Sequence, residues 1–400
     1  MKVAYILCTT SPLTGSHLAF KNLLKGVIAQ GVKPIVVIPD RQDLYNDLKP
    51  LGVPIFITTF RFEIYPYLRS FRDVLLFLPR LVARQVVNWW SVRKLTKYLH
   101  EEKVEIIHTN VSVVNIGYKT AQKLNIPHIY HIREYGDLIG MNYFPTKRHF
   151  INQLSTPNSY SICITNAIQR HFEQDECPRS RVIYDGVCSQ EKEFHIRKKR
   201  NYLLYVGRIE PAKRLLDLLE VYCKYVNTHP NPLQLYVIGA TTNNNYSQLV
   251  SRYVEHNNLS EHIVFWGQRN DVFHFMKHAR AIIIPSLSEG FGFCIAEAMF
   301  NGCLAIGRDL GGTKEQMDNG LELQGEEIAL RYNTPEELLK LLVMVSDESP
   351  EHFIPIIERA FDTVNLLYTR EHHTEQVLQF YNDILTGTIM AHTESTILTQ

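Results

Sequence analysis

The sequence has little of what would anchor a chain in a membrane or cross-link it. No stretch reaches the roughly 20 apolar residues of a spanning helix. The short apolar run within residues 1–8 is expected to be a first strand and not a signal peptide. The seven cysteines are scattered without a Cys-x-x-Cys pair, which argues against a zinc site and a disulfide framework. We therefore expect a soluble, cytoplasmic protein.

The sequence also lacks a motif for binding nucleic acid, although its charge is unevenly divided. Residues 1–200 hold 28 Lys and Arg against 16 Asp and Glu, whereas residues 201–400 hold 14 against 25. A basic half indicates an anionic partner, such as a membrane surface or a phosphorylated acceptor. Nucleic acid is the alternative, but without a motif it is not the expected partner.

What the chain does contain is an alternation of apolar strand runs and amphipathic helices. Its 400 residues, 45% of them hydrophobic, can bury two cores of ordinary size, so two domains are expected. Continuous apolar runs, such as residues 35–38, 202–206 and 281–285, are typical of strands buried on both faces. The alternation predicts an α/β fold with parallel, doubly wound sheets.

The most informative stretch is residues 285–299, where a predicted strand leads through a Gly-rich turn into a predicted helix. Gly290 and Gly292 allow a sharp turn and a close approach to a ligand, and the helix N-terminus behind them suits a phosphate. Glu289 and Glu297 lie on either side of this turn. Because ionised carboxylates only accept hydrogen bonds, sugar hydroxyls are their better partners. A structural turn with two solvated glutamates is the alternative.

The spacing Glu289-x7-Glu297 around Gly-Phe-Gly-Phe resembles the signature of glycosyltransferase family 4, whose members are retaining enzymes of the GT-B fold. The resemblance implies that Glu289 faces the donor sugar and that Glu297 holds the ribose of the nucleotide. It also implies that the turn meets the diphosphate or the sugar, through Gly290, Phe291, Gly292 and Phe293.

Arg208 and Lys213 follow the strand run 202–206 and resemble the family's pair that clamps the donor diphosphate. Arginine offers a two-pronged donor and lysine a compact charge. No Asp-x-Asp cluster stands in a suitable loop, so these two cations and the helix N-terminus are expected to stabilise the departing diphosphate. The expected donor is a nucleoside-diphosphate sugar, with no metal and no other cofactor. A surface Arg and Lys without a ligand is the alternative.

Two positions of the N-terminal half also match the family. The sequence has Gly15-Ser16 where the family usually has Gly-Gly, so only Gly15 carries over as a donor or acceptor contact. His131 matches the family's strand-end histidine near the donor sugar, and titration near neutral pH would suit proton handling there. By residue type alone, His108 and His128 are alternatives, and a strand histidine is more often merely hydrogen-bonded.

Residues 61–99 have a different character, with eight basic side chains against two acidic ones and several interleaved aromatics, including Trp89 and Trp90. Basic and aromatic residues at partly helical spacing favour a surface for anionic lipid headgroups. The alternative is a helix pair whose aromatics pack on the sheet while its arginines stay solvated.

The resemblance extends over most of the chain and implies two Rossmann-like domains that face each other across a cleft. We place them at residues 1–195, for the acceptor, and 196–366, for the nucleotide sugar. A C-terminal helix, 367–386, is expected to cross back to the first domain. The highly charged residues 191–200 are interpreted as the linker between the domains.

The predicted function is retaining transfer of a hexosyl group to a saccharide or lipid-linked saccharide. It would serve bacterial surface polysaccharide synthesis, at the inner face of the membrane. No carboxylate at a matched position suggests a covalent intermediate, so a same-face displacement is expected. A non-catalytic GT-B partner subunit, which usually lacks part of the Arg, Lys, Glu, Glu set, is one alternative. A sugar-nucleotide epimerase or hydrolase, which needs no acceptor surface, is the other.

Overall fold

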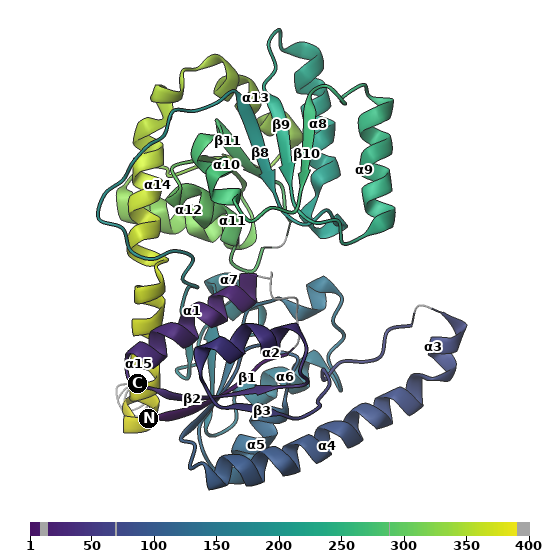
Figure 1. Cartoon of the computed structure of the whole chain (residues 1–400), viewed down its shortest axis with the longest axis vertical. Helices are drawn as coiled ribbons and strands as arrows, with labels where there is room; N and C mark the ends of the chain where they lie inside the picture. Colours follow the sequence, from purple (N-terminus) through teal and green to yellow (C-terminus); the bar gives the residue numbers. More distant parts are fainter. Residues whose placement is uncertain (9–14, 69, 288, 390–400) are drawn as a thin grey trace. The chain divides into compact units, whose positions relative to one another are not determined.

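The computed structural model describes residues 1–8, 15–68, 70–287 and 289–389. The chain divides into two compact units, one made of Met1–Gly186 with Arg370–Gln400 and the other of Val187–Thr369 (Figure 1). Among the described residues, no helix is long and apolar enough to cross a membrane.

In its described residues, the first unit is built on a seven-stranded parallel sheet in the order β3-β2-β1-β4-β5-β6-β7. The strands are β1 (Lys2–Ile6), β2 (Lys33–Ile38), β3 (Ile55–Ile57), β4 (Ile106–Thr109), β5 (His128–Ile132), β6 (Ser159–Cys163) and β7 (Ser180–Val182). The central strands are buried, which is why they read as unbroken apolar runs. The strand order reverses between β1 and β4, which is where ligands gather in sheets of this kind.

The helices of the first unit cover both faces of this sheet. They are α1 (Gly15–Ala29), α2 (Asp43–Leu48), α3 (Phe71–Leu75), α4 (Phe77–Glu101), α5 (Ile116–Leu124), α6 (Lys147–Leu154), α7 (Asn166–His171) and α15 (Arg370–Thr386), with short 3-10 turns at Lys49–Leu51 and Gly136–Ile139. Helices α1 and α15 lie side by side (Figure 1) and share one core with the strands. In that core Phe20 and Phe380 pack with Tyr5, and each such buried side chain contributes about 1.5–3 kcal/mol.

Helix α5 packs against the opposite face of the sheet at Gly117. A Cβ atom at Gly117 would lie 2.2 Å from the Thr109 hydroxyl and 3.1 Å from Ile6. Because only glycine allows this approach, α5 is fixed close to the ends of β1 and β4.

The second unit, in its described residues, is built on a six-stranded parallel sheet in the order β10-β9-β8-β11-β12-β13. The strands are β8 (Tyr202–Val206), β9 (Gln234–Ile238), β10 (Ile263–Gly267), β11 (Ala281–Ile284), β12 (Leu304–Arg308) and β13 (Leu330–Tyr332). The helices are α8 (Leu215–Thr228), α9 (Asn244–His256), α10 (Val272–His278), α11 (Phe293–Phe300), α12 (Gly311–Gln324), α13 (Pro335–Asp347) and α14 (Ile354–Leu367), with 3-10 turns at Pro211–Lys213 and Pro350–Phe353. The expected doubly wound α/β fold is therefore confirmed in both units.

The chain passes between the units at residues 186–187 and 369–370, slightly displaced from the expected 195–196 and 366–367. The reason is a set of bonds that ties the residues after Gly186 to the end of the second unit. The Val187 N–H donates to the Tyr368 carbonyl at 2.9 Å, and Cys188 forms a parallel bridge with Thr369.

The interpretation of residues 191–200 as a linker between the units is wrong. This charged segment belongs to the second unit, where Phe194 packs against the core beside Phe361. The Arg200 N–H also donates to the His278 carbonyl at 2.7 Å. Composition alone favoured a linker, whereas the packing of Phe194 and the hydrogen bond of the Arg200 N–H attach this segment to the second unit.

Candidate nucleotide-sugar site and a buried polar cluster

The strand order of the second sheet reverses between β8 and β11, so the loops that follow these two strands diverge. A crevice outside the carboxyl ends of the strands is expected at such a reversal. The loop after β8 carries Arg208 and Lys213, and the loop after β11 carries Glu289 to Gly292. The fold therefore brings together the two motifs that the sequence analysis singled out.

The loop after β8 is held close to the end of the neighbouring strand. A Cβ atom at Gly239 would lie only 1.9 Å from the Gly207 carbonyl oxygen, so the two glycine backbones are in direct contact. Residues Pro211–Lys213 form a 3-10 turn and Arg214, with a φ of 54°, is left-handed before α8 begins. Lys213 thus stands on a 3-10 turn directly in front of α8.

The loop after β11 is held by α12. Gly292, with a φ of 95°, occupies the cap position of α11 in a conformation that favours glycine. The Gly312 N–H donates to the Glu289 carbonyl at 2.9 Å, and the Gln316 amide donates to the Phe291 carbonyl at 2.6 Å. The Phe291 ring is buried and packs edge-on against Tyr368. The position of Glu289 at the lip of this turn is therefore set by contacts of its own backbone.

The two motifs meet through an ion pair. Lys213 Nζ lies 2.7 Å from Glu289 Oε1, with the side chains 24% and 17% exposed. Burial acts to lower the pKa of Lys213, but the charge and hydrogen bond of Glu289 outweigh it, so the pKa is raised. The ammonium group is therefore charged at neutral pH and can be shared with an incoming anion.

Arg208 and Glu297 complete the set on this side. Arg208 is more exposed, and its Nη2 atom lies 2.8 Å from Glu210 Oε1. Glu297 lies about one turn inside α11 and is partly exposed, as are Gly290 and Phe293. The arrangement offers two cations and, with Glu210, three carboxylates on the loops and helix that follow β8 and β11. It is chemically able to bind an anion beside a hydroxyl-bearing group.

In the first unit, Gly15 is the first residue of α1, and the preceding loop, 9–14, lies outside the described residues. His131 lies at the end of β5, as expected, but it is completely buried. Burial and then the charge of Arg133 lower its pKa well below the usual value. The buried ring of His131 therefore stays neutral near pH 7, which does not suit the proton handling considered for this position.

The other candidate histidines are buried as well. His128 Nε2 lies 2.8 Å from the Thr109 hydroxyl, so this strand histidine is hydrogen-bonded within the core. His108 lies between His131, at 3.1 Å, and the hydroxyl of Tyr381 on α15, at 2.6 Å. The Tyr381 hydroxyl is in turn 3.3 Å from that of Tyr5. His131 therefore ends a chain of buried hydrogen bonds that begins in the core.

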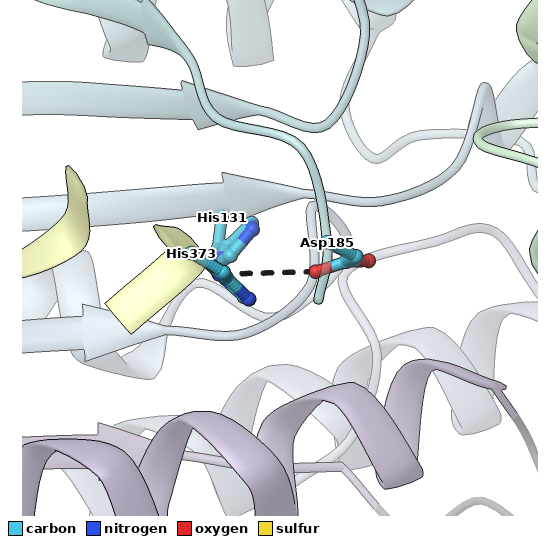
Figure 2. A group of neighbouring side chains, drawn as sticks. All are labelled: His131, Asp185 and His373. Atoms are coloured by element: carbon cyan, nitrogen blue, oxygen red, sulfur yellow. Dashed lines mark ion pairs between the residues drawn. The ribbon is translucent and has the colours of Figure 1, made fainter. Parts of the chain in front are cut away.

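His131 lies in a buried cluster with Asp185 and His373 that was not apparent from the sequence (Figure 2), and Arg133 pairs with its aspartate. Arg133 forms an ion pair with Asp185, and the two side chains are only 3% and 0% exposed. Burial raises the pKa of Asp185, and the ion pair with Arg133 opposes the rise. His373 comes from α15 and reaches Asp185 Oδ1 at 3.9 Å. No local pattern reveals this cluster, because Asp185 and His373 are far from His131 and Arg133 in the sequence.

The potential ligand atoms of His131, Asp185 and His373 lie within 4.8 Å of one another, which raises the question of a metal ion. His373 Nδ1 accepts the Gly186 N–H at 3.1 Å, and His131 Nδ1 faces Arg133 Nη2 at 3.3 Å. A neutral imidazole that accepts through Nδ1 carries its proton on Nε2. Both Nε2 atoms are buried without a hydrogen-bond partner among the described residues. They present N–H groups where a metal requires lone pairs, so the cluster does not fit a metal ion.

Within residues 61–99, residues 71–75 form α3 and residues 77–99 belong to α4. Phe71 is 79% exposed, and Trp89 and Trp90 are about half exposed, so these aromatics do not pack on the sheet. Several arginines are engaged and not simply solvated: Arg80 pairs with Asp73, and Arg84 donates to the Ile64 carbonyl. Arg69 lies outside the described residues.

Comparisons with known proteins agree with this geometry. Residues 189–342 match the family described as glycosyl transferases group 1. An uncharacterized glycosyltransferase of Methanocaldococcus jannaschii is 25% identical over 71% of this chain and 74% of its own length. The Escherichia coli UDP-Gal:alpha-D-GlcNAc-diphosphoundecaprenol alpha-1,3-galactosyltransferase is 26% identical over 85% of this chain and 89% of its own length.

Solved structures show the same fold. The crystal structure of Anabaena HepE in complex with UDP and glucose has a TM-score of 0.73 at 16% identity, over 96% of this chain and 99% of that one. Sucrose-phosphate synthase from Thermosynechococcus elongatus has a TM-score of 0.71 at 16% identity, over 96% and 99%. The protein therefore has the GT-B fold, and residues 189–342, which lie in its second unit, match the glycosyl transferases group 1 family.

Proposed function

We propose that this glycosyltransferase moves a hexosyl group, with retention of configuration, from a nucleoside-diphosphate sugar to a lipid-linked saccharide. The reaction would take place at the inner face of a bacterial membrane, in the assembly of a surface polysaccharide. The observation that carries the proposal is the pairing of Lys213 with Glu289 where the second sheet reverses its strand order. A carboxylate and a cation from the two diverging loops fit a sugar joined to a diphosphate.

The diphosphate of the donor would compete with two carboxylates for the two cations of the site, Lys213 and Arg208. Lys213 and Arg208 each pair with a carboxylate that is itself partly open to solvent. A diphosphate carries more charge than a carboxylate and can bind both cations at once, Arg208 through its planar fork. As the sugar departs, negative charge grows on the diphosphate, and the same two groups stabilise it.

The two glutamates, Glu289 and Glu297, would contact different parts of the donor. Glu297, within α11, accepts hydrogen bonds from the ribose hydroxyls. Glu289, which pairs with Lys213 when no ligand is bound, yields that ammonium group to the diphosphate and then faces the transferred sugar. No carboxylate is assigned as a covalent nucleophile, so the acceptor hydroxyl attacks on the face from which the diphosphate leaves.

The acceptor is proposed from the relatives and from the charge of the first unit. The E. coli relative, by its name, transfers galactose to a sugar on diphosphoundecaprenol. The first half of this chain is strongly basic, and residues 61–99 expose aromatics beside arginines. Each basic side chain near an anionic surface contributes about 1 kcal/mol, so binding to anionic vesicles at low salt and release at high salt are expected. No binding to anionic vesicles by the intact protein would favour a soluble acceptor.

The leaving group is proposed to depart without help from a metal ion, because Lys213 and Arg208 supply the positive charge. Transfer by the purified protein should therefore survive an excess of EDTA. A complete loss of activity that magnesium restores would show that a metal ion shares this role.

The central test is a thermal-shift screen of the whole protein against UDP, GDP, ADP and their sugars, followed by transfer to lipid-extract acceptors. We expect one nucleotide series to stabilise the protein, and Lys213→Ala to abolish that shift. Conversion of the sugar nucleotide without any acceptor would indicate an epimerase or hydrolase instead. The absence of any nucleotide shift would indicate a non-catalytic partner subunit.

A further inference from the structure

The first unit contains a groove of about 760 Å³ between α4 and α5. Val86, Trp89 and Trp90 of α4 form one wall, and Tyr118 and Lys123 of α5 belong to the other. The volume lies within the range of about 300–1,000 Å³ that is usual for small-molecule sites. The lining is mainly apolar, with lysine and glutamine side chains along α5.

An exposed apolar stripe runs along α3 and α4 into this groove. Its members recur at three- and four-residue intervals and are about half exposed or more: Phe71, Leu75, Leu78, Val82, Val86 and Trp89. Within α4, this spacing places Leu78, Val82, Val86 and Trp89 on one side of the helix. That side differs from the buried side of α4, which is formed by Ser91, Val92, Leu95 and Leu99. Helix α4 thus has two apolar sides, of which the chain itself covers one.

Positive charge lies beside the groove without an acidic partner. The Arg93 guanidinium stands 4.9 Å from the ring centre of Trp89 and 5.9 Å from that of Trp90. Among the described residues, neither Arg93 nor Lys123 forms an ion pair, whereas Lys119 is paired with the buried Glu63. Lys123, which lines the groove, and Arg93, beside the two tryptophans that also line it, are therefore available to an anionic group.

We propose that this groove binds the hydrocarbon chain of the lipid-phosphate acceptor, with the phosphate beside Arg93 and Lys123. The proposal rests on the proposed transfer to a lipid-linked acceptor. A flat membrane contact needs only protruding side chains, such as those of the stripe. A groove serves a chain that is held apart from the bilayer, and the substrate is the lipid that the enzyme must hold individually.

The position of α5 supports the same occupant. This helix lines the groove with its middle and last turns, and its first turn follows the loop after β4. Gly117 fixes that first turn against Thr109 at the end of β4, where the order of the first sheet reverses. One rigid helix therefore connects the groove with the sheet edge at which the acceptor's sugar is expected.

The test uses dodecyl phosphate, a single chain with a phosphate head, below its micelle-forming concentration. Calorimetric titration of the full chain should detect binding of dodecyl phosphate. Inorganic phosphate should give none, and dodecyl maltoside, with its neutral head, should bind more weakly. Lys123→Gln should lower the affinity for dodecyl phosphate several-fold, because it removes one of the two unpaired cations.

Two variants that differ by one helical turn separate the groove from the stripe. Val86→Trp places a large ring in the groove and should weaken the binding of dodecyl phosphate by about tenfold or more, since the hydrocarbon chain loses its apolar contact. Val82→Trp adds the same ring to the stripe outside the groove and should leave this affinity unchanged. Both positions are exposed, so neither change disturbs the core. Gln122→Trp, which fills the groove from α5, should repeat the effect of Val86→Trp.

The proposal is overturned if dodecyl phosphate does not bind, or if both groove-filling variants bind it like the wild type. It is also overturned if Val86→Trp and Val82→Trp lose affinity equally, which would indicate bulk membrane contact along the stripe. Nucleoside-diphosphate binding is measured in the same preparations. Retained nucleotide binding confines a failure to the groove, whereas absent nucleotide binding would refute the proposed function itself.

Discussion

Each sheet carries an ion pair near the carboxyl ends of its strands, and the two pairs differ in their contact with solvent. Lys213 and Glu289 of the second unit are 24% and 17% exposed, whereas Arg133 and Asp185 of the first are 3% and 0% exposed. A partly exposed pair contributes little to stability and can exchange one partner for a ligand. A buried pair cannot lose one member without leaving an uncompensated charge. The first arrangement suits binding, and the second holds segments of the chain together.

Arg133 and Asp185 lie where the chain leaves the first unit and where it returns to it. Asp185 precedes Gly186, at which the chain leaves the first unit, and His373 lies in the helix with which the chain returns. The Gly186 N–H donates to His373, so the outgoing and returning segments are joined directly. Charge at the edge of a sheet is therefore no sufficient sign of a ligand site, because exposure decides between the two roles.

The largest expected effect is on stability. Asp185→Asn leaves the Arg133 charge buried without its partner and should lower the free energy of unfolding by about 3–5 kcal/mol. Nucleoside-diphosphate affinity should be unchanged at a temperature where the variant is folded. Chemical denaturation and calorimetric titration measure the two quantities.

Asp383→Asn is the matched control, because Asp383 pairs with the partly exposed Arg181 in the same unit. It should cost about 1 kcal/mol or less. An equally mild effect of Asp185→Asn would contradict the contrast between the two kinds of pair.

The next effect concerns the second unit, where removing one member of an ion pair should reduce nucleotide binding and leave the fold intact. Lys213→Ala and Arg208→Ala each remove a charge-assisted phosphate contact of about 1.5–3 kcal/mol, so affinity for the nucleoside diphosphate should fall about 10- to 100-fold. Transfer should fall at least as much. Lys224→Ala, on the exposed side of α8, is the control. Undiminished affinity in both site variants would refute the assignment of these cations to the diphosphate.

A smaller effect distinguishes the two glutamates. Glu297→Gln replaces an acceptor-only group at the ribose and should weaken nucleotide binding by about 1 kcal/mol. Glu289→Gln removes a negative charge that competes for Lys213, so nucleotide affinity should be kept or rise while turnover falls. Calorimetry and initial rates separate these outcomes. If neither property changes in either variant, the turn at residues 289–297 is structural only.

The smallest effect is a pH dependence that belongs to the first unit. Burial, and then Arg133, lower the pKa of His373 to about 3, below the ordinary value of 6.5 that it has when unfolded. The unfolded chain therefore takes up this proton first, and the stability from the neutral ring is complete above pH 6.5 and is lost as the pH falls toward 3. At pH 5.5 the loss should be about 1 kcal/mol for this histidine.

Denaturation at pH 7.5 and 5.5 measures this loss, and His373→Gln should reduce the difference between the two values. The glutamine keeps an acceptor for the Gly186 N–H. His195→Gln, on a side chain that is 67% exposed, is the control. An unchanged difference in His373→Gln would show that the ring is not held neutral by the fold.

The candidate site of the second unit could be predicted from the sequence because its parts are local. Each motif follows a buried strand, and the glycines that shape the turn stand within the motif. Lys213 and Glu289 lie 76 positions apart, yet a parallel sheet places the carboxyl ends of all its strands at one edge. What the sequence could not give is the direct pairing of the two side chains, since that depends on β8 and β11 being neighbours.

The sequence by itself determined the two doubly wound units, because strand periodicity and turn chemistry act over a few residues. The family resemblance, in turn, selected Arg208, Lys213, Glu289 and Glu297 as candidate site residues. Only the tertiary structure decided that His131 is buried and neutral and that residues 191–200 are part of the second unit. It also decided that Asp185 and His373 join Arg133. The physical reason is that burial and pairing arise when distant segments exclude water together, and no local pattern records which segments those are.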